Sequence, residues 1–234
     1  MILGIMQPYF VPYIGYWQLM NAVDKYVVYD DVNYIKGGWI NRNRVLSADG
    51  FQYFNVQMLG ASPNKLINEV LVDHDERIIA KNVRKLENIY GRAPFYLDVM
   101  PIMERILKYN AKSIADYNVN SIEEIKNYLE IDTELVLSSI LEKDNSLRGQ
   151  DKVLAICKLM EADEYYNAIG GRELYSFEAF RAENVKLSFL KPGKVVYSQL
   201  RSEFIPDLSI IDVMMFNSRD SINEMLNNYE LVTE

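Results

Sequence analysis

Residues 1 to 44, MILGIMQPYFVPYIGYWQLMNAVDKYVVYDDVNYIKGGWINRNR, form the stretch that decides the fold. Two apolar runs, residues 2 to 6 and 26 to 30, have the length of buried strands. They bracket an aromatic loop broken by prolines and a short helix from about Gly15 to Val23. This order predicts two parallel strands with the loop at the carboxyl edge of their sheet, where such folds bind ligands. We therefore expect the functional site at this loop.

The rest of the chain predicts an α/β protein with a parallel sheet. RVLSA and FQYFNVQM, separated by the turn ADG, predict a hairpin. From residue 75 to about 145, apolar residues recur at helical spacing, and this block includes TELVLSSILEK. Strands are then expected in EYYNAI, VKLSFLKP and KVVYSQL, with helices in DKVLAICKLMEA and from PDLSIIDVMMF onward. We expect an α/β domain of residues 1–72 plus 146–234 and a helical insertion of residues 73–145.

Composition excludes several classes of function. The 234 residues are 49% hydrophobic and carry a net charge of −8, which suits a globular protein and disfavours nucleic acid as a partner. The single cysteine, Cys157, and the single histidine, His74, cannot form a disulfide or a Cys/His metal cluster, so no metal site is predicted. No apolar run approaches the ~20 residues of a membrane span. We expect a cytoplasmic protein.

The aromatic loop QPYFVPYIGYWQL, residues 7 to 19, is the first candidate for binding. Pro8 and Pro12 stiffen the loop, so that Gln7 and Tyr9 are held at the sheet edge. Gly15 lets the helix begin close to a ligand, and the helix start favours an anion. The alternative is an aromatic plug in the core, but glutamine and two prolines are poor core fillers.

A cationic segment follows the second strand and is expected at the same sheet edge. Lys36, Arg42 and Arg44 lie within nine residues of one another, together with Asn41. Guanidinium and amide groups in this mixture are suited to phosphate or carboxylate oxygens. A solvated basic face is the alternative explanation.

Further polar residues stand at the ends of predicted strands. Asp30 and Asp31 end the second strand, where a carboxylate commonly binds a sugar hydroxyl or a metal-bound phosphate, although turn formation explains them equally well. Gly170 and Gly171 form a glycine turn after a later strand. Ser209, in PDLSIID, is interpreted as a helix N-cap.

The motifs resemble those of a known family. QPYFVPYIGYWQLMNAVDKYVVYDDVNYIKGGWINRNRV, YNAIGGRELY and SEFIPDLSIIDVMMFN are similar in content and order to the WbqC-like family, over essentially the whole chain. That family is associated with bacterial surface-polysaccharide (O-antigen) gene clusters. The resemblance implies, as one role, transfer of an acyl or aminoacyl group to an amino sugar.

A more distant resemblance concerns the fold and the loop. The order of strand, aromatic loop, helix and strand is similar to the nucleotidylyltransferase and pantothenate-synthetase superfamily, which implies a Rossmann-like sheet. The loop of that superfamily bears a His-x-Gly-His motif, and Tyr13 and Tyr16 stand here where the histidines would be. A phenol can donate a hydrogen bond but carries no positive charge at neutral pH. Ordinary adenylyl transfer would therefore need compensation from the cationic segment.

Together these observations predict an enzyme that forms an amide on the amine of a nucleotide-linked amino sugar. The expected partner is a small molecule, either the nucleotide-sugar or an acyl donor, and a bound nucleotide, Mg²⁺ or an oligomer is compatible with the sequence. Two alternatives are a nucleotidylyltransferase-like enzyme that uses ATP or CTP and a non-catalytic nucleotide-sugar-binding protein. The expected catalytic residues are Tyr13, Tyr16 and Lys36, and the expected substrate-binding residues are Gln7, Tyr9, Gly15, Asp30, Asp31, Asn41, Arg42, Arg44, Gly170 and Gly171.

Overall fold

A computed structural model describes residues 1–234 and has a Rossmann-like α/β fold built on a six-stranded sheet. The strands lie in the order β10-β9-β8-β1-β2-β7, and all pairs are parallel except β9 with β10. The predicted α/β class is therefore confirmed. The strands of this sheet are β1 (Ile2–Met6), β2 (Lys25–Val28), β7 (Glu134–Leu137), β8 (Glu164–Ala168), β9 (Lys186–Pro192) and β10 (Tyr229–Val232).

β1 lies in the middle of the sheet, next to the point where the strand order changes direction. β1 pairs with β2 on one side, with Met6 opposite Val28, and with β8 on the other side, with Ile2 opposite Glu164. From β1 the sheet is built in one direction through β2 and β7, whereas β8, β9 and β10 are added on the other side of β1. The strand order therefore changes direction between β1 and β8. In open α/β sheets ligands bind beyond the carboxyl ends of the strands at such a point. The aromatic loop leaves β1 at this edge.

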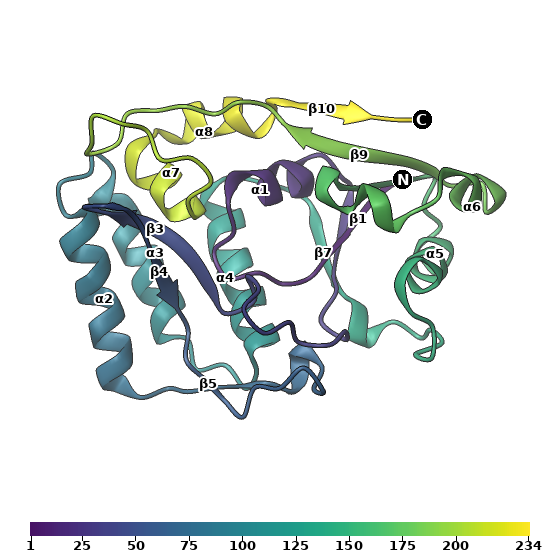
Figure 1. Ribbon diagram of the computed structural model, residues 1–234, viewed down its shortest axis with the longest axis horizontal. Coiled ribbons are helices and arrows are strands. Elements are labelled where there is room, and N and C mark those ends of the chain that lie inside the picture. The colour runs from purple at the N-terminus through teal and green to yellow at the C-terminus, as the bar shows by residue number, and fades with distance from the viewer.

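Helices cover both faces of the sheet, and a helical block extends it on one side (Figure 1). Alternation along β1 separates the two faces, because Leu3 and Ile5 pack with α5 and α6 whereas Met6 packs against the larger core shared with α1 and α4. The larger core also includes α2, α3, α7 and α8. The helices are α1 (Ile14–Asn21), α2 (Glu76–Tyr90), α3 (Tyr96–Lys108), α4 (Ile114–Tyr128), α5 (Gly149–Leu159), α6 (Phe177–Ala182), α7 (Ile210–Phe216) and α8 (Arg219–Leu226).

Two small two-stranded sheets flank the main one. β3 (Arg42–Ser47) and β4 (Gly50–Asn55) form the predicted hairpin, and β5 (Met58–Leu59) pairs with β6 (Leu71–Val72). Helices α2 to α4 then fill most of the predicted insertion, residues 73–145. Short 3₁₀ helices complete the chain at Ile67–Glu69, Ser138–Ile140 and Ile169–Leu174.

Two predicted elements differ from the structure. TELVLSSILEK was expected to be helical, but its residues 134–137 form β7 at the sheet edge. KVVYSQL was expected to be a strand, but residues 195–200 have no regular secondary structure. In that segment Tyr197 and Gln199 instead donate hydrogen bonds to the carboxylate of Asp212 on α7.

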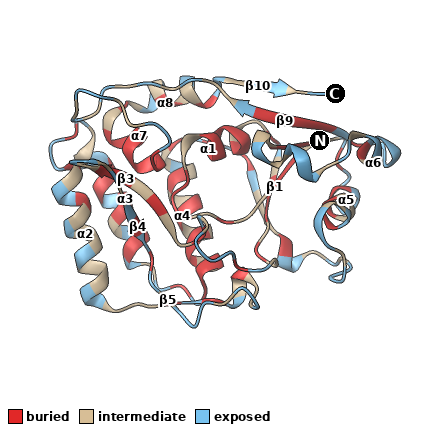
Figure 2. Ribbon diagram, in the orientation of Figure 1, coloured by how far each residue is buried: buried red, intermediate tan, exposed pale blue.

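Burial follows the layers of the fold. β1, β9, α1 and α4 carry many of the buried residues, whereas α2 exposes its outer side (Figure 2). The larger core contains 45 buried residues and joins the sheet to the helical block, so α2 to α4 are packed as part of the same body. None of the helices combines the length and the apolar character needed to cross a membrane.

Candidate functional site

The aromatic loop between β1 and α1 is fixed mainly through its own carbonyl groups. Buried side chains donate to four of them. Three come from distant parts of the chain: Asn118 Nδ2 to Pro8 O at 2.8 Å, Asn43 Nδ2 to Phe10 O at 3.0 Å and Ser209 Oγ to Val11 O at 2.6 Å; the fourth, Trp17 Nε1 to Pro12 O at 3.1 Å, comes from the adjoining helix α1. The loop therefore does not depend on a ligand for its shape. Such fixed backbone geometry is what a preorganised binding site requires.

Strain in the loop supports the same interpretation. Val11 has a φ of 38°, which is unfavourable for a β-branched residue and unusual for one that precedes proline. Its side chain is fully buried, so packing and the hydrogen bond from Ser209 hold the conformation. Backbone strain that the surroundings enforce in this way is concentrated at functional sites.

Tyr13 and Tyr16 have different environments. The ring of Tyr13 covers the start of α1, and a Cβ atom added at Gly15 would lie 2.5 Å from it. Gly15 thus makes room for the tyrosine ring. Tyr16 is only 2% exposed, its ring packs against those of Trp17 and Tyr26, and its hydroxyl donates to Gln7 O at 3.2 Å. Tyr16 therefore supports the loop from within the core, whereas Tyr13 lines its outer surface.

A pocket of about 280 Å³ lies against the outer surface of this loop. It is lined by aromatic rings, one guanidinium, one amide and one carboxylate, contributed by Tyr9, Pro12, Tyr13, Trp39, Asn43, Arg44 and Asp207. Burial raises the pKa of both Tyr9 and Tyr13, and the charge of Asp207 adds to the effect on Tyr13. Both phenols therefore stay protonated at neutral pH and can donate hydrogen bonds to a ligand. We call this the aromatic pocket.

Arg44 is the only cation that lines the aromatic pocket. Its guanidinium lies 5.4 Å from the ring of Trp39 and 5.1 Å from that of Phe51, and its Nη2 donates to Asp207 O at 3.0 Å. Its buried Nε has no hydrogen-bond partner. A guanidinium that lines a pocket beside aromatic rings is suited to an anionic ligand that also has a flat or apolar part.

The other residues of the predicted cationic segment do not line this pocket. Arg42 donates through Nε to Gly38 O at 3.2 Å and also bonds Gly37 O, so it holds the preceding turn. Asn41 uses its amide internally, accepting from Tyr34 and donating to Val56 O. Lys36 is exposed on the turn. Of the three cations expected to bind phosphate together, only Arg44 therefore lines this pocket.

A second, mostly apolar pocket of about 340 Å³ adjoins the first, and the two share Tyr13 and Asp207. Its wall is the irregular segment between β9 and α7, with Pro192, Val195, Val196, Tyr197, Phe204 and Pro206 among the lining residues. We call this the apolar pocket. Asp207, at the boundary of the two, has a φ of 54° and an exposed side chain. Asp207 was not among the predicted site residues, because an irregular segment carries no periodic signal in the sequence.

Asp212 holds the irregular segment in place. Its carboxylate accepts hydrogen bonds from Tyr197 and Gln199 of that segment, each at 2.7 Å, and from Tyr90 of α2 at 3.0 Å. Burial raises the pKa of Asp212, and these three hydrogen bonds partly oppose the rise. Ser209 caps α7, as predicted, by accepting from Ile211 N.

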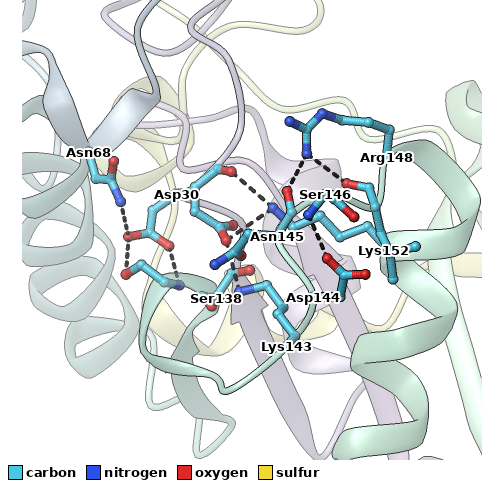
Figure 3. A network of polar contacts seen from close by, with 12 residues as sticks. Asp30, Asn68, Ser138, Lys143, Asp144, Asn145, Ser146, Arg148 and Lys152 are labelled. Atoms are coloured by element: carbon cyan, nitrogen blue, oxygen red, sulfur yellow. Dashed lines mark hydrogen bonds and ion pairs between the residues drawn. The ribbon is translucent and has the colours of Figure 1, made fainter.

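Asp30 and Asp31 lie in a separate polar cluster beyond the ends of β2 and β7 (Figure 3). Asp30 accepts from Ser139 N at 2.9 Å and from Ser139 Oγ at 2.6 Å, whereas Asp31 pairs with Lys143 and Lys152. The two ammonium groups share one oxygen of Asp31, so this donor set does not suit a magnesium ion. We therefore derive no role for Mg²⁺ here.

The predicted glycine turn lies beyond the end of β8. Gly170 and Gly171 belong to the 3₁₀ helix Ile169–Leu174, and neither lines the two pockets. A Cβ atom at Gly170 would meet no atom within 4 Å, whereas one at Gly171 would lie 3.3 Å from the Asn167 amide. Gly171 therefore makes space for Asn167, and Gly170 is open to the outside.

Another hollow, of about 860 Å³, lies between α2 and β4. Arg77, Lys81, Arg84 and Lys85 line it, and only two of its nine lining residues are hydrophobic. Because ligand sites are predominantly apolar with a few placed polar groups, we favour the smaller aromatic pocket as the candidate site.

Comparison with known proteins agrees with the motifs of the aromatic loop. The model of the WbqC-like protein family matches residues 7–224, which include the loop, the hairpin, and the residues that form both pockets. An uncharacterized protein of Mycobacterium tuberculosis, Rv1507c, is 30% identical over 219 residues, covering 92% of each chain. The chain therefore belongs to the WbqC-like protein family.

Proposed function

We propose that this protein binds a nucleotide-linked amino sugar in the aromatic pocket and transfers an acyl or aminoacyl group to the amine of that sugar. The observation that carries the proposal is the pair of adjoining pockets, one aromatic and cationic and one apolar, that share Tyr13 and Asp207. Two compartments with a common boundary can hold two substrates next to each other, which favours direct transfer between them.

The aromatic pocket suits the nucleotide-sugar. Tyr9, Tyr13 and Trp39 offer faces for a base or a sugar ring, and Arg44 offers charged donors for a phosphate oxygen. The apolar pocket would then take the acyl chain of the donor.

The reaction can proceed by direct attack. The amine nitrogen attacks the acyl carbonyl carbon, the new C–N bond forms, and the bond from that carbon to the leaving group of the donor breaks. The proton lost by the amine passes to the Asp207 carboxylate at the shared boundary and then to the leaving group. Tyr13, with its raised pKa, would donate to the developing oxyanion.

The nucleotidylyltransferase alternative has less support. Histidines of that superfamily act on phosphate from two places in the loop, but one of the corresponding residues here, Tyr16, is buried and bonded to Gln7 O. A tyrosine in that position does not reach a bound phosphate. We therefore favour amide formation over nucleotidyl transfer.

The test is a turnover assay with matched readouts. The purified protein is incubated with uridine and thymidine diphosphate sugars that carry a free amine, together with acyl-coenzyme A thioesters. Mass spectrometry measures the masses of the products. We expect a sugar product that is heavier by one acyl group. The Asp207→Asn variant should not form this product, whereas the control variant Asp220→Asn, on α8, should form it. ATP–pyrophosphate exchange without acylation would support the nucleotidylyltransferase alternative, and tight binding without any product would support a binding protein.

A further inference from the structure

The hairpin of β3 and β4 carries a row of rings and guanidinium groups that begins at the aromatic pocket. Trp39, just before β3, and Arg44 line that pocket, and the Arg44 guanidinium also lies 5.1 Å from the centre of the Phe51 ring. The Phe51 and Tyr53 rings are 5.9 Å apart, and the guanidinium of Arg42 lies 4.5 Å from the centre of the Tyr53 ring. We call these five side chains the hairpin strip.

The alternation of side chains along a β-strand puts the strip on the outer face of the hairpin. Tyr53 lies opposite Arg44 in the register, and Phe51, two residues before Tyr53, shares its face of β4. Phe54 faces the other way and is fully buried. Trp39, Phe51 and Tyr53 are 37%, 45% and 41% exposed, so the strip is open to a ligand. Neighbouring large apolar side chains that stay exposed mark a surface that binds something.

The hairpin strip is also positively charged. Arg42 donates to the carbonyl groups of Gly37 and Gly38, and Arg44 donates to that of Asp207. Carbonyl groups do not neutralise a guanidinium, so both positive charges stay available to an anion in a protein whose net charge is −8. Rings interleaved with guanidinium groups are suited to stacking a base and pairing with the phosphates that accompany it.

The aromatic pocket is too small for a whole nucleotide-sugar. Its volume of about 280 Å³ lies below the roughly 300–1,000 Å³ that drug-sized ligands occupy, and a nucleoside diphosphate-sugar is at least drug-sized. The pocket has room for the amino sugar, whereas the diphosphate and the nucleoside must extend out of it. Of the two surfaces that continue from this pocket, the apolar pocket suits an acyl chain. The hairpin strip, which shares Trp39 and Arg44 with the aromatic pocket, suits the nucleotide.

We propose that the hairpin strip is the nucleotide subsite of this protein. The amino sugar enters the aromatic pocket, the diphosphate pairs with Arg44, and the base stacks on Phe51 and Tyr53. Arg44 lines the pocket and also lies next to the Phe51 ring, which is where a diphosphate joining the two parts of the ligand would pass. This inference rests on the proposed function, because it assigns the parts of the same nucleotide-sugar to places along one surface.

Calorimetric titration of the full chain with two ligands tests the subsite. Uridine diphosphate contains the base and the diphosphate, whereas glucosamine 1-phosphate contains only the amino sugar and one phosphate. Tyr53→Thr should weaken binding of uridine diphosphate by about 5- to 100-fold, the effect of losing one stacked ring. Binding of glucosamine 1-phosphate should stay nearly unchanged, because Tyr53 does not line the aromatic pocket. Threonine is well tolerated in an exposed strand, so this variant should fold.

Further variants separate stacking from other effects of substitution. Phe51→Thr should also weaken binding of uridine diphosphate, whereas Phe51→Trp, which keeps a flat ring, should retain it. Leu59→Thr, at a 50% exposed position on β5 outside the strip, is the control and should bind both ligands as the wild-type protein does. An equal loss of both ligands in Tyr53→Thr would overturn the assignment of the base to the strip.

The outcomes distinguish this inference from the proposed function. If the wild-type protein binds both ligands and the Tyr53→Thr and Phe51→Thr variants keep full affinity for uridine diphosphate, the nucleotide subsite is wrong and the proposed function stands. If the wild-type protein binds neither ligand, the proposed function is wrong and this inference fails with it. A dimer in analytical ultracentrifugation that Tyr53→Thr dissociates, with unchanged affinity for uridine diphosphate, would make the strip a contact between two copies of the chain.

Crystals of the wild-type protein soaked with 5-bromouridine diphosphate provide a measurement that does not depend on any variant. The bromine atom is attached to the base and scatters anomalously, so it reports where the base lies. The anomalous peak should lie beside the ring of Phe51 or Tyr53. A peak inside the aromatic pocket, or none at the strip, would overturn the proposal.

Discussion

Tyr13 and Tyr16 stand three residues apart but contribute to different properties of the molecule. Tyr13 lines both pockets and its hydroxyl makes no hydrogen bond within the protein, whereas the Tyr16 hydroxyl donates to Gln7 O from inside the core. We therefore expect Tyr13 to contribute to ligand binding and Tyr16 to contribute to the stability of the fold.

Tyrosine-to-phenylalanine substitutions should separate these two roles. Tyr13→Phe should leave the Tm nearly unchanged and reduce turnover or affinity by about 0.5–1.5 kcal/mol, the value of one hydrogen bond to the ligand. Tyr16→Phe should lower the free energy of unfolding by about 0.5–1.5 kcal/mol. Urea unfolding measures stability, and the acylation assay measures function. The opposite pattern would show that Tyr13 only packs and that Tyr16 is the functional residue.

Arg44 should account for most of the charge recognition in the aromatic pocket. Arg44→Met keeps an unbranched side chain between Trp39 and Phe51 but removes the guanidinium. Binding of uridine diphosphate should weaken by about 1.5–3 kcal/mol, the value of hydrogen bonds to a charged group. Calorimetric titration with uridine diphosphate compares Arg44→Met with the control variant Arg92→Met, at an exposed position after α2. Equal affinities in the two variants would remove Arg44 from the site.

Among the elements, the irregular segment between β9 and α7 depends on one carboxylate. Asp212 accepts from Tyr197 and Gln199 and thereby fixes the wall of the apolar pocket. The segment has no ladder of backbone hydrogen bonds, so this contact replaces the sheet pairing that its apolar residues would otherwise suggest.

Tyr197→Phe should destabilise the protein in a way that depends on pH. Because burial raises the pKa of Asp212 above its value in the unfolded chain, ionisation of this group disfavours the folded state as pH rises through that range. The Tyr197 hydroxyl offsets part of this cost, so its loss should lower the free energy of unfolding by about 1–3 kcal/mol at pH 8 and by less where Asp212 is protonated. Urea unfolding at pH 8 and pH 4 measures the difference. Tyr229→Phe on β10 is the control, and an effect independent of pH would contradict the argument.

At the scale of the whole molecule, the smaller core beneath the sheet encloses Cys157. This thiol is fully buried among residues of β1, β8 and α6, and burial raises its pKa to about 12. Reaction with a thiol reagent should therefore require global unfolding. Labelling measured across a urea series should follow the unfolding curve obtained by circular dichroism. Labelling well below the transition would show that α5 opens locally.

The sequence predicted the elements whose signal is local. The parallel strands, the hairpin at the turn ADG and the helices of the insertion follow from periodicity within each segment. β7 was missed because ELVL is a short apolar run that fits a helix as well as a strand. The apolar pocket could not be predicted, because its wall is fixed by contacts such as Tyr90 to Asp212, 122 residues apart. Tyr13 and Arg44 were predicted as site residues, and their role in binding stays a prediction.

The central position of β1 has a consequence for how the chain is made. β1 leaves the ribosome well before its partner β8, which begins at Glu164, opposite Ile2. At ordinary rates of translation, roughly ten to thirty seconds separate the two strands. During that interval one edge of an apolar strand remains unpaired while the helices α2 to α4 already have their own neighbours to fold against. In a growing chain, such a segment is the one most exposed to aggregation and to capture by chaperones.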